Sequence, residues 1–537
     1  MSYIQDKFKV IRNKAKLEAL ASDVRVNALS SYGGQGVKRT MTGFNPKIDD
    51  PNYNLTTTLP DIRGKSRELY NTSAIAKGAI DVKVSNVVGS GLQVESRIEP
   101  TLLGITADEA QAKQDIIEKR FRMWAKGNES SMSQDNNFYS MQVQSMRSML
   151  IDGDAVSLLY RLFKDKNRPN QVNPLVIQNV GAHQLCNENN TQDTETMIQG
   201  IEIDKHGAPK AYMIVSPDKK WFGSSSDGRM SGTWKRFAKY GSKSGSLNVV
   251  HFKNPESRVG QYRGLPCIAP VVDLIKDLTD YSKAELTATT LASMFTVFIK
   301  HPTGDITQSA ISDFVVPSDS KESLMVNGLP ASEKTDADGN QYKLQAGAIL
   351  ALENDESIET ASPNRPNTAF NEFVNAVLTE IGMGIGVPFE VLIKKYQSSY
   401  SASRAAFLDA WKTFQQLRSW LASQWCQPTY EAWLELEVLQ GNIDLKGFLT
   451  DPLMRKAWSS ATWHGDARGM IDPVKEVNAS ILMIDNHLST RERESRLRTG
   501  EDWDNTIARD AYEIKKMKEL GVIEEQPVEV VEEDGEK

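Results

Sequence analysis

The chain has 537 residues, of which 39% are hydrophobic, so it can bury a large core; its 70 acidic and 63 basic side chains give a net charge of −7. This acidic balance disfavours tight, sequence-specific nucleic-acid binding, which usually requires a basic domain, and no apolar run reaches the roughly 18 residues of a membrane span. The three cysteines, Cys186, Cys267 and Cys426, are too far apart in sequence for a disulfide scaffold or a paired-cysteine metal site, which is typical of a protein in a reducing cytosol.

The N-terminal part is predicted to be irregular at first and then helical. A short basic helix and a segment rich in Gly, Ser and Asn occupy residues 1–60. Apolar side chains at helical spacing predict a helix over 61–88, which ends at the glycines that follow it. Further helix is predicted within 107–151.

The segment from 153 to 253 changes to strand character. It contains short runs of β-branched and aromatic residues that are separated by Gly, Pro and Asn. Lys205-His206-Gly207 lies between two such runs and predicts a hairpin turn. Because helices precede and follow this strand cluster, the fold class is predicted to be α+β.

Two amphipathic helices are predicted around an insertion. Apolar residues with a period near 3.6 run through 266–299 and again through 366–387. The intervening residues, 301–360, have a loop-and-strand composition. Since the second helix must return the chain across this insertion, we expect the two helices to lie antiparallel.

The sequence KKYQSSYSASRAAFLDAW, residues 394–411, joins a small polar loop to a third long helix. This helix is predicted from Ser403, with Ser401 or Ser403 as its N-cap. Its aromatic stripe predicts packing in the core or between subunits. The stripe consists of Phe407, Trp411, Phe414, Leu421 and Trp425. Residues 472–520 are predicted to be helical, and the acidic tail after them to be disordered.

No catalytic pattern rises above background. The segment 223–230 has two glycines at P-loop spacing, but Arg229 and Met230 occupy the places of the required Lys and Ser/Thr. Lys243 stands where a nucleophile elbow needs Ser. The six histidines are scattered without zinc-ligand spacing. The sequence therefore predicts no catalytic residues, no metal site and no cofactor, although catalytic residues can also be assembled from distant positions.

Several segments together resemble the portal proteins of tailed phages, and specifically the lambda-type portal family. The resemblance covers roughly residues 60–510 and rests on an ordered set of segments rather than on one decisive motif. These segments are 66–91, GDAV at 153–156, 200–214, 258–293, GMGIGVPFEVL at 382–392, 400–414 and 471–504.

The resemblance implies a mainly helical α+β portal fold with wing, stem, clip and crown regions, which assembles into a ring with a central channel. It implies a kinked long helix with its bend near Gln427-Pro428. The implied regions are an N-terminal arm (1–60), the wing (61–264), a stem helix (265–299), the clip (300–362), a returning stem helix (363–388), a tunnel loop (389–402), the long kinked helix with the rest of the wing (403–469), the crown (470–520) and an acidic disordered tail (521–537).

The tunnel loop is the implied DNA-contacting element. Its hydroxyl groups, phenol rings and two lysines suit weak contacts with phosphates, which carry no sequence information. The alternative is a solvated loop that caps the next helix. The candidate site residues are Lys394, Lys395, Tyr396, Gln397, Ser398, Ser399, Tyr400 and Ser401.

The implied function is a head-to-tail connector: a homo-oligomeric ring, typically of twelve subunits, at one capsid vertex. It would conduct double-stranded DNA without sequence specificity during packaging and ejection. The expected partners are the terminase large subunit at the clip, then head-completion or adaptor proteins, and the major capsid and scaffolding proteins, with no membrane. The expected location is the virion portal vertex, and the host cytoplasm during assembly.

Two points stay open from the sequence. Arg258 and Arg263, just before the stem helix, fit either ion pairs between subunits or exposed side chains. The rival functions are a phage-encoded hydrolase or nuclease with dispersed catalytic residues, and a tail-associated or scaffolding protein.

Overall fold

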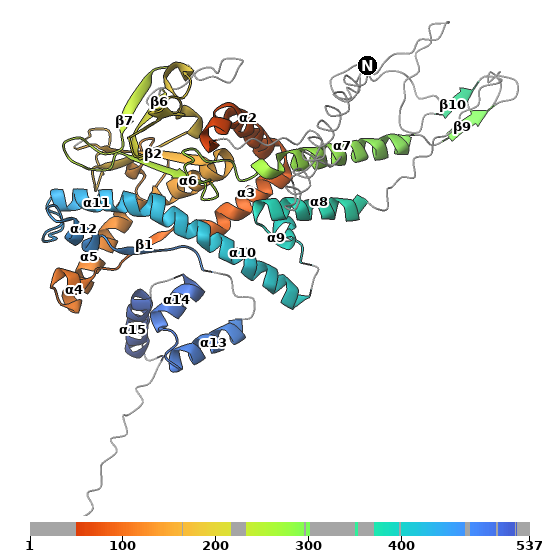
Figure 1. The fold of residues 1–537 in the computed structure, drawn as a ribbon. Helices are drawn as coiled ribbons and strands as arrows, with labels where there is room; N and C mark the ends of the chain where they lie inside the picture. The colour runs from red at the N-terminus through yellow and green to blue at the C-terminus, as the bar shows by residue number, and fades with distance from the viewer. Residues whose placement is uncertain are drawn as a thin grey trace, which may run out of the picture. The chain divides into compact units, whose positions relative to one another are not determined.

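The computed structural model describes residues 50–163, 165–215, 232–294, 297–300, 349–352, 370–396, 399–467, 473–500, 503–520 and 522 (Figure 1). The chain divides into two compact units, Met1–Asn54 and Leu55–Lys537, and the account below concerns the second. The predicted basic N-terminal helix, most of the expected clip, the first residues (366–369) of the second predicted amphipathic helix and the acidic tail other than Val522 lie outside the described residues. Within the described ranges, no helix combines the length and the hydrophobicity that crossing a bilayer would require.

Two helices replace the single helix predicted over 61–88. They are α2 (Pro51–Thr72) and α3 (Ala74–Val87). Ser73, with φ −105° and ψ 120°, is extended between them. The prediction was wrong because Asn71, Thr72 and Ser73 are poor helix formers that compete for backbone hydrogen bonds. Helix α2 also begins inside the segment predicted to be an irregular arm.

The helices predicted within 107–151 are confirmed as α5 (Ala107–Lys126) and α6 (Phe138–Asp152), preceded by the short α4 (Pro100–Leu103). Thr106 and Glu109 form a reciprocal capping box at the start of α5. The Asn137 side chain accepts a hydrogen bond from the Ser140 amide and caps α6. The local sequence therefore sets both helix starts.

The expected strand cluster forms two antiparallel sheets. The first has the order β3 (Leu175–Val180), β2 (Asp154–Arg161), β8 (Val249–Lys253). The second contains β4 (Met197–Ile198), β5 (Ile201–Ile203), β6 (Pro209–Val215) and β7 (Trp234–Ala238). Strand β2 is buried on both faces: Ala155 and Leu159 join the main core, whereas Val156 and Leu158 join a smaller core shared with the second sheet.

The hairpin predicted at residues 205–207 is confirmed between β5 and β6. Gly207 has a φ of 81°, in the left-handed region that glycine enters readily. One carboxylate oxygen of Asp204 accepts hydrogen bonds from the His206 and Ala208 amides, both at 2.8 Å. The sequence reading missed β7, and also β1 (Gln93–Ser96) and β11 (Ala461–His464), which pair antiparallel. The four-residue strands β1 and β11 come from segments more than 360 residues apart, so no local pattern links them.

The two amphipathic helices around the insertion are confirmed as α7 (Val272–Met294) and α8 (Phe370–Ile385), and they run antiparallel side by side (Figure 1). Tyr281 stacks on Phe370 with ring centroids 5.6 Å apart. The first helix is shorter than the predicted 265–299. It follows a 3-10 turn, η5 (Ala269–Val271), and strand β9 (Val297–Lys300) pairs in parallel with β10 (Ile349–Leu352). The β-branched and aromatic residues of β9 favour a strand over helix.

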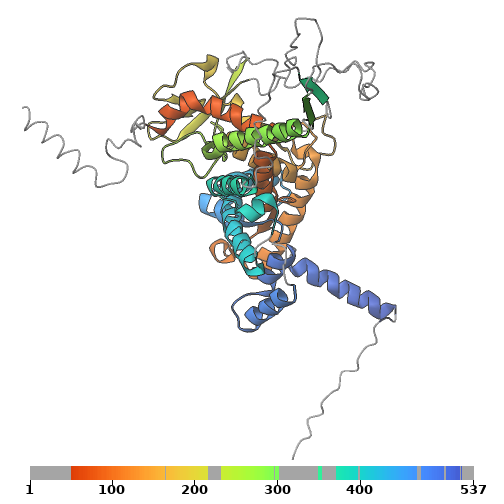
Figure 2. The ribbon, with the colours of Figure 1, turned by 90° about the vertical axis from the view of Figure 1, so that its right-hand side faces the viewer.

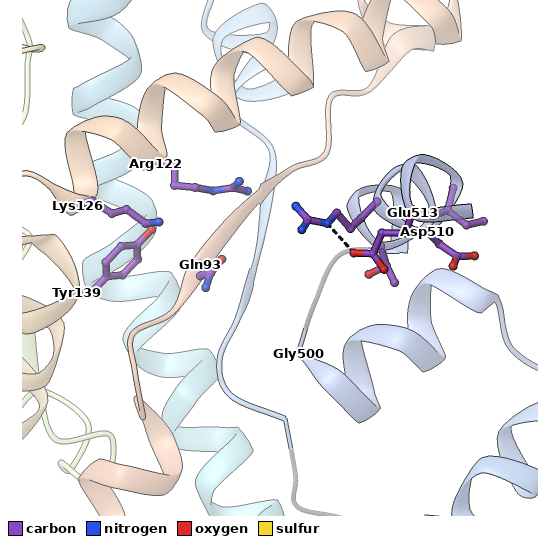
Figure 3. Close-up of a pocket in the computed structure, with 10 residues that line it drawn as sticks. Gln93, Arg122, Lys126, Tyr139, Gly500, Asp510 and Glu513 are labelled. Carbon is purple, nitrogen blue, oxygen red and sulfur yellow. Dashed lines mark hydrogen bonds and ion pairs between the residues drawn. The ribbon is translucent and has the colours of Figure 1, made fainter. Parts of the chain in front are cut away.

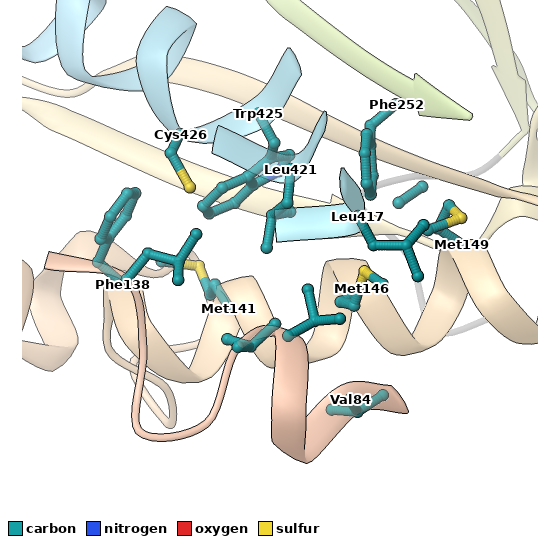
Figure 4. Packing of buried hydrophobic residues seen from close by; sticks show 14 of the residues in the cluster. Val84, Phe138, Met141, Met146, Met149, Phe252, Leu417, Leu421, Trp425 and Cys426 are labelled. Carbon is teal, nitrogen blue, oxygen red and sulfur yellow. The ribbon is translucent and has the colours of Figure 1, made fainter. Parts of the chain in front are cut away.

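Helix α10 (Tyr400–Leu421) continues through a π-helical turn, η7 (Ala422–Cys426), into α11 (Gln427–Leu439). The irregular turn directly precedes the Gln427-Pro428 pair where a bend was expected. The indole of Trp425 stacks on Phe138 of α6 at 5.2 Å and donates a hydrogen bond to the Ser157 hydroxyl at 2.8 Å. Figure 4 shows the methionines of α6 facing Leu417, Leu421 and Trp425. Core packing is thereby confirmed for the aromatic stripe, with Phe407 and Trp411 at its half-buried edge.

The C-terminal part is helical, as predicted. After α12 (Pro452–Trp458) and β11, it comprises α13 (Pro473–Asp485), α14 (Arg491–Thr499) and α15 (Trp503–Glu519), the blue helices of Figures 1 and 2. Helix α14 begins at the capping residue Thr490 and ends at Gly500, which has a φ of 77°. These caps delimit α14, whose own sequence is rich in charged residues and has no apolar stripe.

Candidate functional site

The loop that carries the candidate site residues is held from its N-terminal side by a short helix, α9 (Phe389–Ile393). Val391 and Leu392 of α9 are buried against α3 and α10. Lys394 then adopts a left-handed conformation with a φ of 55°, and the Lys395 amide donates to the carbonyl of Glu390 at 3.2 Å. The left-handed residue and this hydrogen bond terminate α9 and turn the chain outwards.

Helix α10 begins at Tyr400, three residues before the predicted start. The Ser399 hydroxyl accepts a hydrogen bond from the Ala402 amide at 3.3 Å and is the N-cap, not Ser401 or Ser403. The expected tunnel loop over 389–402 is therefore too long at both ends, since α9 and the first turn of α10 lie within it. The connection between the helices is residues 394–399.

The structure brings part of the candidate set to the surface. Lys394, Lys395, Tyr396 and Ser399 are exposed. Gln397 and Ser398 lie outside the described residues, and the side chains of Tyr400 and Ser401 are not described either. Two cations and one phenol ring are thus presented on a short connection whose two ends are fixed by helices.

A buried ionic cluster that sequence reasoning missed lies where α2, the first sheet and the segment leading to α7 meet. Asp154, fully buried at the start of β2, accepts hydrogen bonds from Arg63 and Arg263, both at 2.6 Å. The Gly264 amide donates to the same carboxylate at 2.7 Å, and the His251 ring nitrogen lies 3.4 Å from it. One carboxylate therefore ties together residues from four separate segments.

The Asp154 cluster is electrostatically asymmetric. Burial alone would raise the pKa of Asp154, but Arg263, His251 and Arg63 outweigh it and hold the pKa well below its usual range. Burial, reinforced by Arg263, lowers the pKa of Arg63 to about 10, so Arg63 stays charged at neutral pH. Burial also lowers the pKa of His251, although Asp154 opposes the shift. At neutral pH the Asp154 carboxylate therefore faces two buried cations and a neutral imidazole, and the Asp152–Arg67 ion pair lies beside Arg63.

Arg263 answers one of the questions that the sequence left open, and both alternatives for it were wrong. Its side chain is buried, and besides Asp154 it donates to the carbonyls of Leu185 and Gln199, both at 2.7 Å. It is therefore an internal structural residue of one subunit. Arg258 is exposed on the single chain, which fits both alternatives for that residue.

The segments around Asp154 and Arg263 also touch through their backbones. Gly153, with a φ of 87°, lies against Gly264 so closely that a Cβ atom on either residue would overlap the other's carbonyl. The Cys267 amide donates to the Leu150 carbonyl at 2.9 Å, and Asn254 donates to that of Gly153 at 2.9 Å. The GDAV segment (153–156) and the segment 263–267 are far apart in sequence. Their contacts hold the chain just before the N-terminal end of α7 against the first sheet.

A second acidic hub joins the β1–β11 ribbon to α14. Glu95 on β1 pairs with Arg97 and Arg496, and His464 on β11 lies 2.5 Å from its carboxylate. Burial would raise the pKa of Glu95, but the hydrogen bonds with His464, Thr462 and Arg496 outweigh it and lower the pKa to about 2. A cavity of about 630 Å³ lies beside this junction.

No arrangement typical of an enzyme emerges from the described residues. Within them, no three His, Cys, Asp or Glu side chains gather to hold a metal ion. The three cysteines are free thiols, and burial raises the pKa of each, which disfavours the reactive thiolate form. The perturbed groups at Asp154 and Glu95 are engaged in ion pairs that hold structural elements together.

Comparison with known proteins assigns the family. The family model described as phage portal protein, lambda family, matches residues 37–418, which is well over half of the chain. The chain belongs to the lambda family of phage portal proteins. This match confirms the resemblance noted from the sequence. Phage portal proteins are structural components of the virion at a capsid vertex.

Individual portal relatives match almost end to end. The portal protein of Escherichia phage N15 is 24% identical over 495 residues, covering 91% of this chain and 90% of that protein. Portal protein B of Escherichia phage lambda is 24% identical over 509 residues, with the same coverage of both chains. A probable portal protein of a Halomonas phage is 21% identical over 472 residues, covering 86% and 81%.

Among solved structures, a chain from the neck of a native GTA particle computed with C12 symmetry has a TM-score of 0.35. It is 11% identical, and the match covers 82% of this portal protein and 92% of that chain. A chain from the neck of an empty GTA particle gives a TM-score of 0.36 at 11% identity, covering 86% and 97%.

Proposed function

We propose that this portal protein forms a homo-oligomeric ring whose bore conducts double-stranded DNA during packaging and ejection. The observation that carries the proposal is the match to the lambda-family portal model over residues 37–418. Nothing in the described part of the chain favours the alternative of a hydrolase or nuclease. In this assignment the protein acts through geometry and carries out no chemistry of its own.

Within the ring, we assign the regions as the resemblance implied. The sheets and α2–α6 form the wing, the antiparallel pair α7 and α8 forms the stem, and α13–α15 form the crown. The insertion between β9 and β10 is the clip, where the terminase large subunit docks and head-completion proteins later replace it. The capsid and scaffolding proteins contact the wing. The antiparallel packing of α7 on α8 supports the stem assignment.

Mass and shape test the ring directly. The chain has a mass of 59.8 kDa. Light scattering behind size-exclusion chromatography should give a particle many times heavier, and negative-stain images should show an annulus with a central hole. A particle of one or two chains under assembly conditions would overturn the proposal.

The connection at residues 394–399 is proposed to be the part of the channel wall that touches DNA. Each subunit presents Lys394, Lys395 and Tyr396 at the surface. A ring repeats these weak contacts many times around the duplex, which multiplies their effect. Lysine–phosphate contacts are independent of sequence and are weakened by salt, so the duplex is retained without being locked in place.

Replacing both loop lysines by glutamine should lower the yield of DNA packaged into particles several-fold, because each subunit loses two phosphate contacts. Packaging is measured as nuclease-protected DNA at two salt concentrations. Lys412→Gln, at an exposed position on α10, is the matched control and should package normally. Equal packaging by the loop variant and the control would contradict the assignment of the loop.

A loop deletion must respect the helix boundaries. Removing 396–402 would also remove Ser399 and the first turn of α10, so any loss of packaging would mix a loop effect with a folding defect. Replacing residues 396–398 by Gly-Gly-Ser tests the connection alone.

A further inference from the structure

The helix α13 has its polar and apolar faces reversed relative to an ordinary surface helix. Its inward face buries Glu476 and Ser480, which are only 5% and 6% exposed. Arg498 of α14 binds Glu476 at 2.6 Å, and the Ser480 hydroxyl donates to Glu494 at 2.6 Å. The α13–α14 contact is therefore held largely by charged and polar groups.

The outward face of α13 carries exposed aliphatic side chains, with the exposed Asn478 between Val474 and Ile481. Val474 is 70% exposed and Ile481 is 49% exposed, and both point to the same side because they are seven residues apart. Leu482 and Leu488 extend this apolar surface and are also exposed. A helix normally turns such a stripe towards a protein core, but no part of the chain that the structure describes covers this face.

The helix α15 presents a second unpartnered stripe. Every side chain from 506 to 516 is exposed, including Ile507, Ala511 and Ile514, which lie on one face. A cavity of about 730 Å³ lies between α15 and α5, and Ile507, at one edge of the stripe, is among its lining residues. Figure 3 shows Arg122 and Lys126 on one side of this cavity and Asp510 and Glu513 of α15 on the other. A helix of this length owes most of its stability to packing. Among the residues that the structure describes, only Trp503 and Met517, near its two ends, are partly buried in α15.

The two stripes match in spacing and in charge. On α13, Val474 and Ile481 are followed four residues later by Asp485. On α15, Ile507 and Ile514 are followed four residues later by Lys518. A seven-residue repeat is the spacing of a seam between two packed helices. In a parallel alignment the aliphatic residues meet in pairs and a carboxylate meets an ammonium group.

We propose that α15 of one subunit packs in parallel on the outward face of α13 of the neighbouring subunit, with Ile481 facing Ile514. A closed ring needs heterologous contacts, in which two different surfaces of the same chain meet, and the two stripes are such a pair. The inference rests on the proposed ring and adds to it the contact that links adjacent C-terminal segments. The partner is a second copy of this chain.

Engineered disulfides test the contact and its register. The double variant Ile481→Cys with Ile514→Cys should form links between subunits under mild oxidation and give a ladder of multimers on a non-reducing gel. Each single variant and the unmodified chain, with its own three cysteines, serve as controls. Val474→Cys with Ile514→Cys is shifted by seven residues, about 10 Å along the helix, and should not link.

The outcomes separate this inference from the ring itself. A ring that forms but gives no link in the 481–514 variant overturns the α13–α15 contact and leaves the proposed function intact. A link within one chain also overturns it. A failure of the unmodified chain to form any ring overturns the proposed function instead.

A charge placed in the seam provides a second, independent measurement. Ile481→Asp should raise the subunit concentration needed for ring formation by about tenfold or more, as for a buried interface residue. Ala479→Asp adds the same charge to the exposed side of α13 away from the seam and should leave assembly unchanged. Circular dichroism melting checks that both variants fold. Equal assembly of the two variants would contradict the seam.

Discussion

The Asp154→Ala variant is expected to lose about 3–5 kcal/mol of the free energy of unfolding, because it leaves the buried Arg63 and Arg263 without the carboxylate that both of them contact. Both guanidinium groups lie 2.6 Å from this carboxylate, and the side chain of Asp154 is fully buried. Asp154→Asn should lose a similar amount of the free energy of unfolding, since an amide carries no charge and would place N–H donors near other donors. The loss is measured as a shift in the first unfolding transition in urea and on heating.

A surface ion pair provides the matched control for Asp154. Asp409 lies 3.8 Å from Lys412, and both side chains are 79% exposed. Asp409→Ala should change the stability by no more than about 0.5 kcal/mol, as exposed pairs contribute little. If Asp154→Ala unfolded at the same urea concentration as Asp409→Ala, the cluster would not be the structural hub described above.

The Gly153→Ala variant is expected to cost about 2–5 kcal/mol, combining backbone strain with a steric clash. Alanine at a φ of 87° is strained by roughly 1–2 kcal/mol. Its Cβ would also overlap the Gly264 carbonyl. This backbone group cannot move without shifting the segment that leads into the N-terminal end of α7. The measurement is again the first unfolding transition.

Gly104→Ala separates the two contributions. Gly104 has a φ of 65°, but a Cβ there meets nothing within 4 Å, so only the strain of about 1–2 kcal/mol should appear. A Gly153 variant no less stable than the Gly104 variant would show that the backbone contact with Gly264 is dispensable.

The sequence predicted the long elements well and their ends poorly. The antiparallel pair α7 and α8 followed from apolar periodicity, and the hairpin at Gly207 followed from its turn residues. The end of α7 and the start of α10 were misplaced, and the break at Ser73 was missed. At such positions the local free energies of the helical and the alternative backbone conformations differ by less than the energy of one tertiary contact. Local preference therefore cannot decide between them.

The candidate loop was located from its composition, but its true extent required the structure. The run of Tyr, Gln and Ser indicated a polar connection, whereas the burial of Val391 and Leu392 against α3 and α10 decided that α9 is helical. The Asp154 cluster left a weaker trace in the sequence: a carboxylate at the start of a mostly apolar, buried strand, in the GDAV segment. Such a residue must find a buried partner, but nothing local identifies Arg63 or Arg263.

By itself, the sequence determined the α+β class, the order of the main elements and, through its resemblance, the portal family. Periodicity, turn residues and segment order are properties of the chain read from one end to the other. Only the tertiary structure decided that Asp154, Arg63 and Arg263 form one cluster, that β1 pairs with β11, and that α13 and α15 turn apolar stripes outwards. These features depend on which distant residues meet, and that depends on the packing of the whole chain.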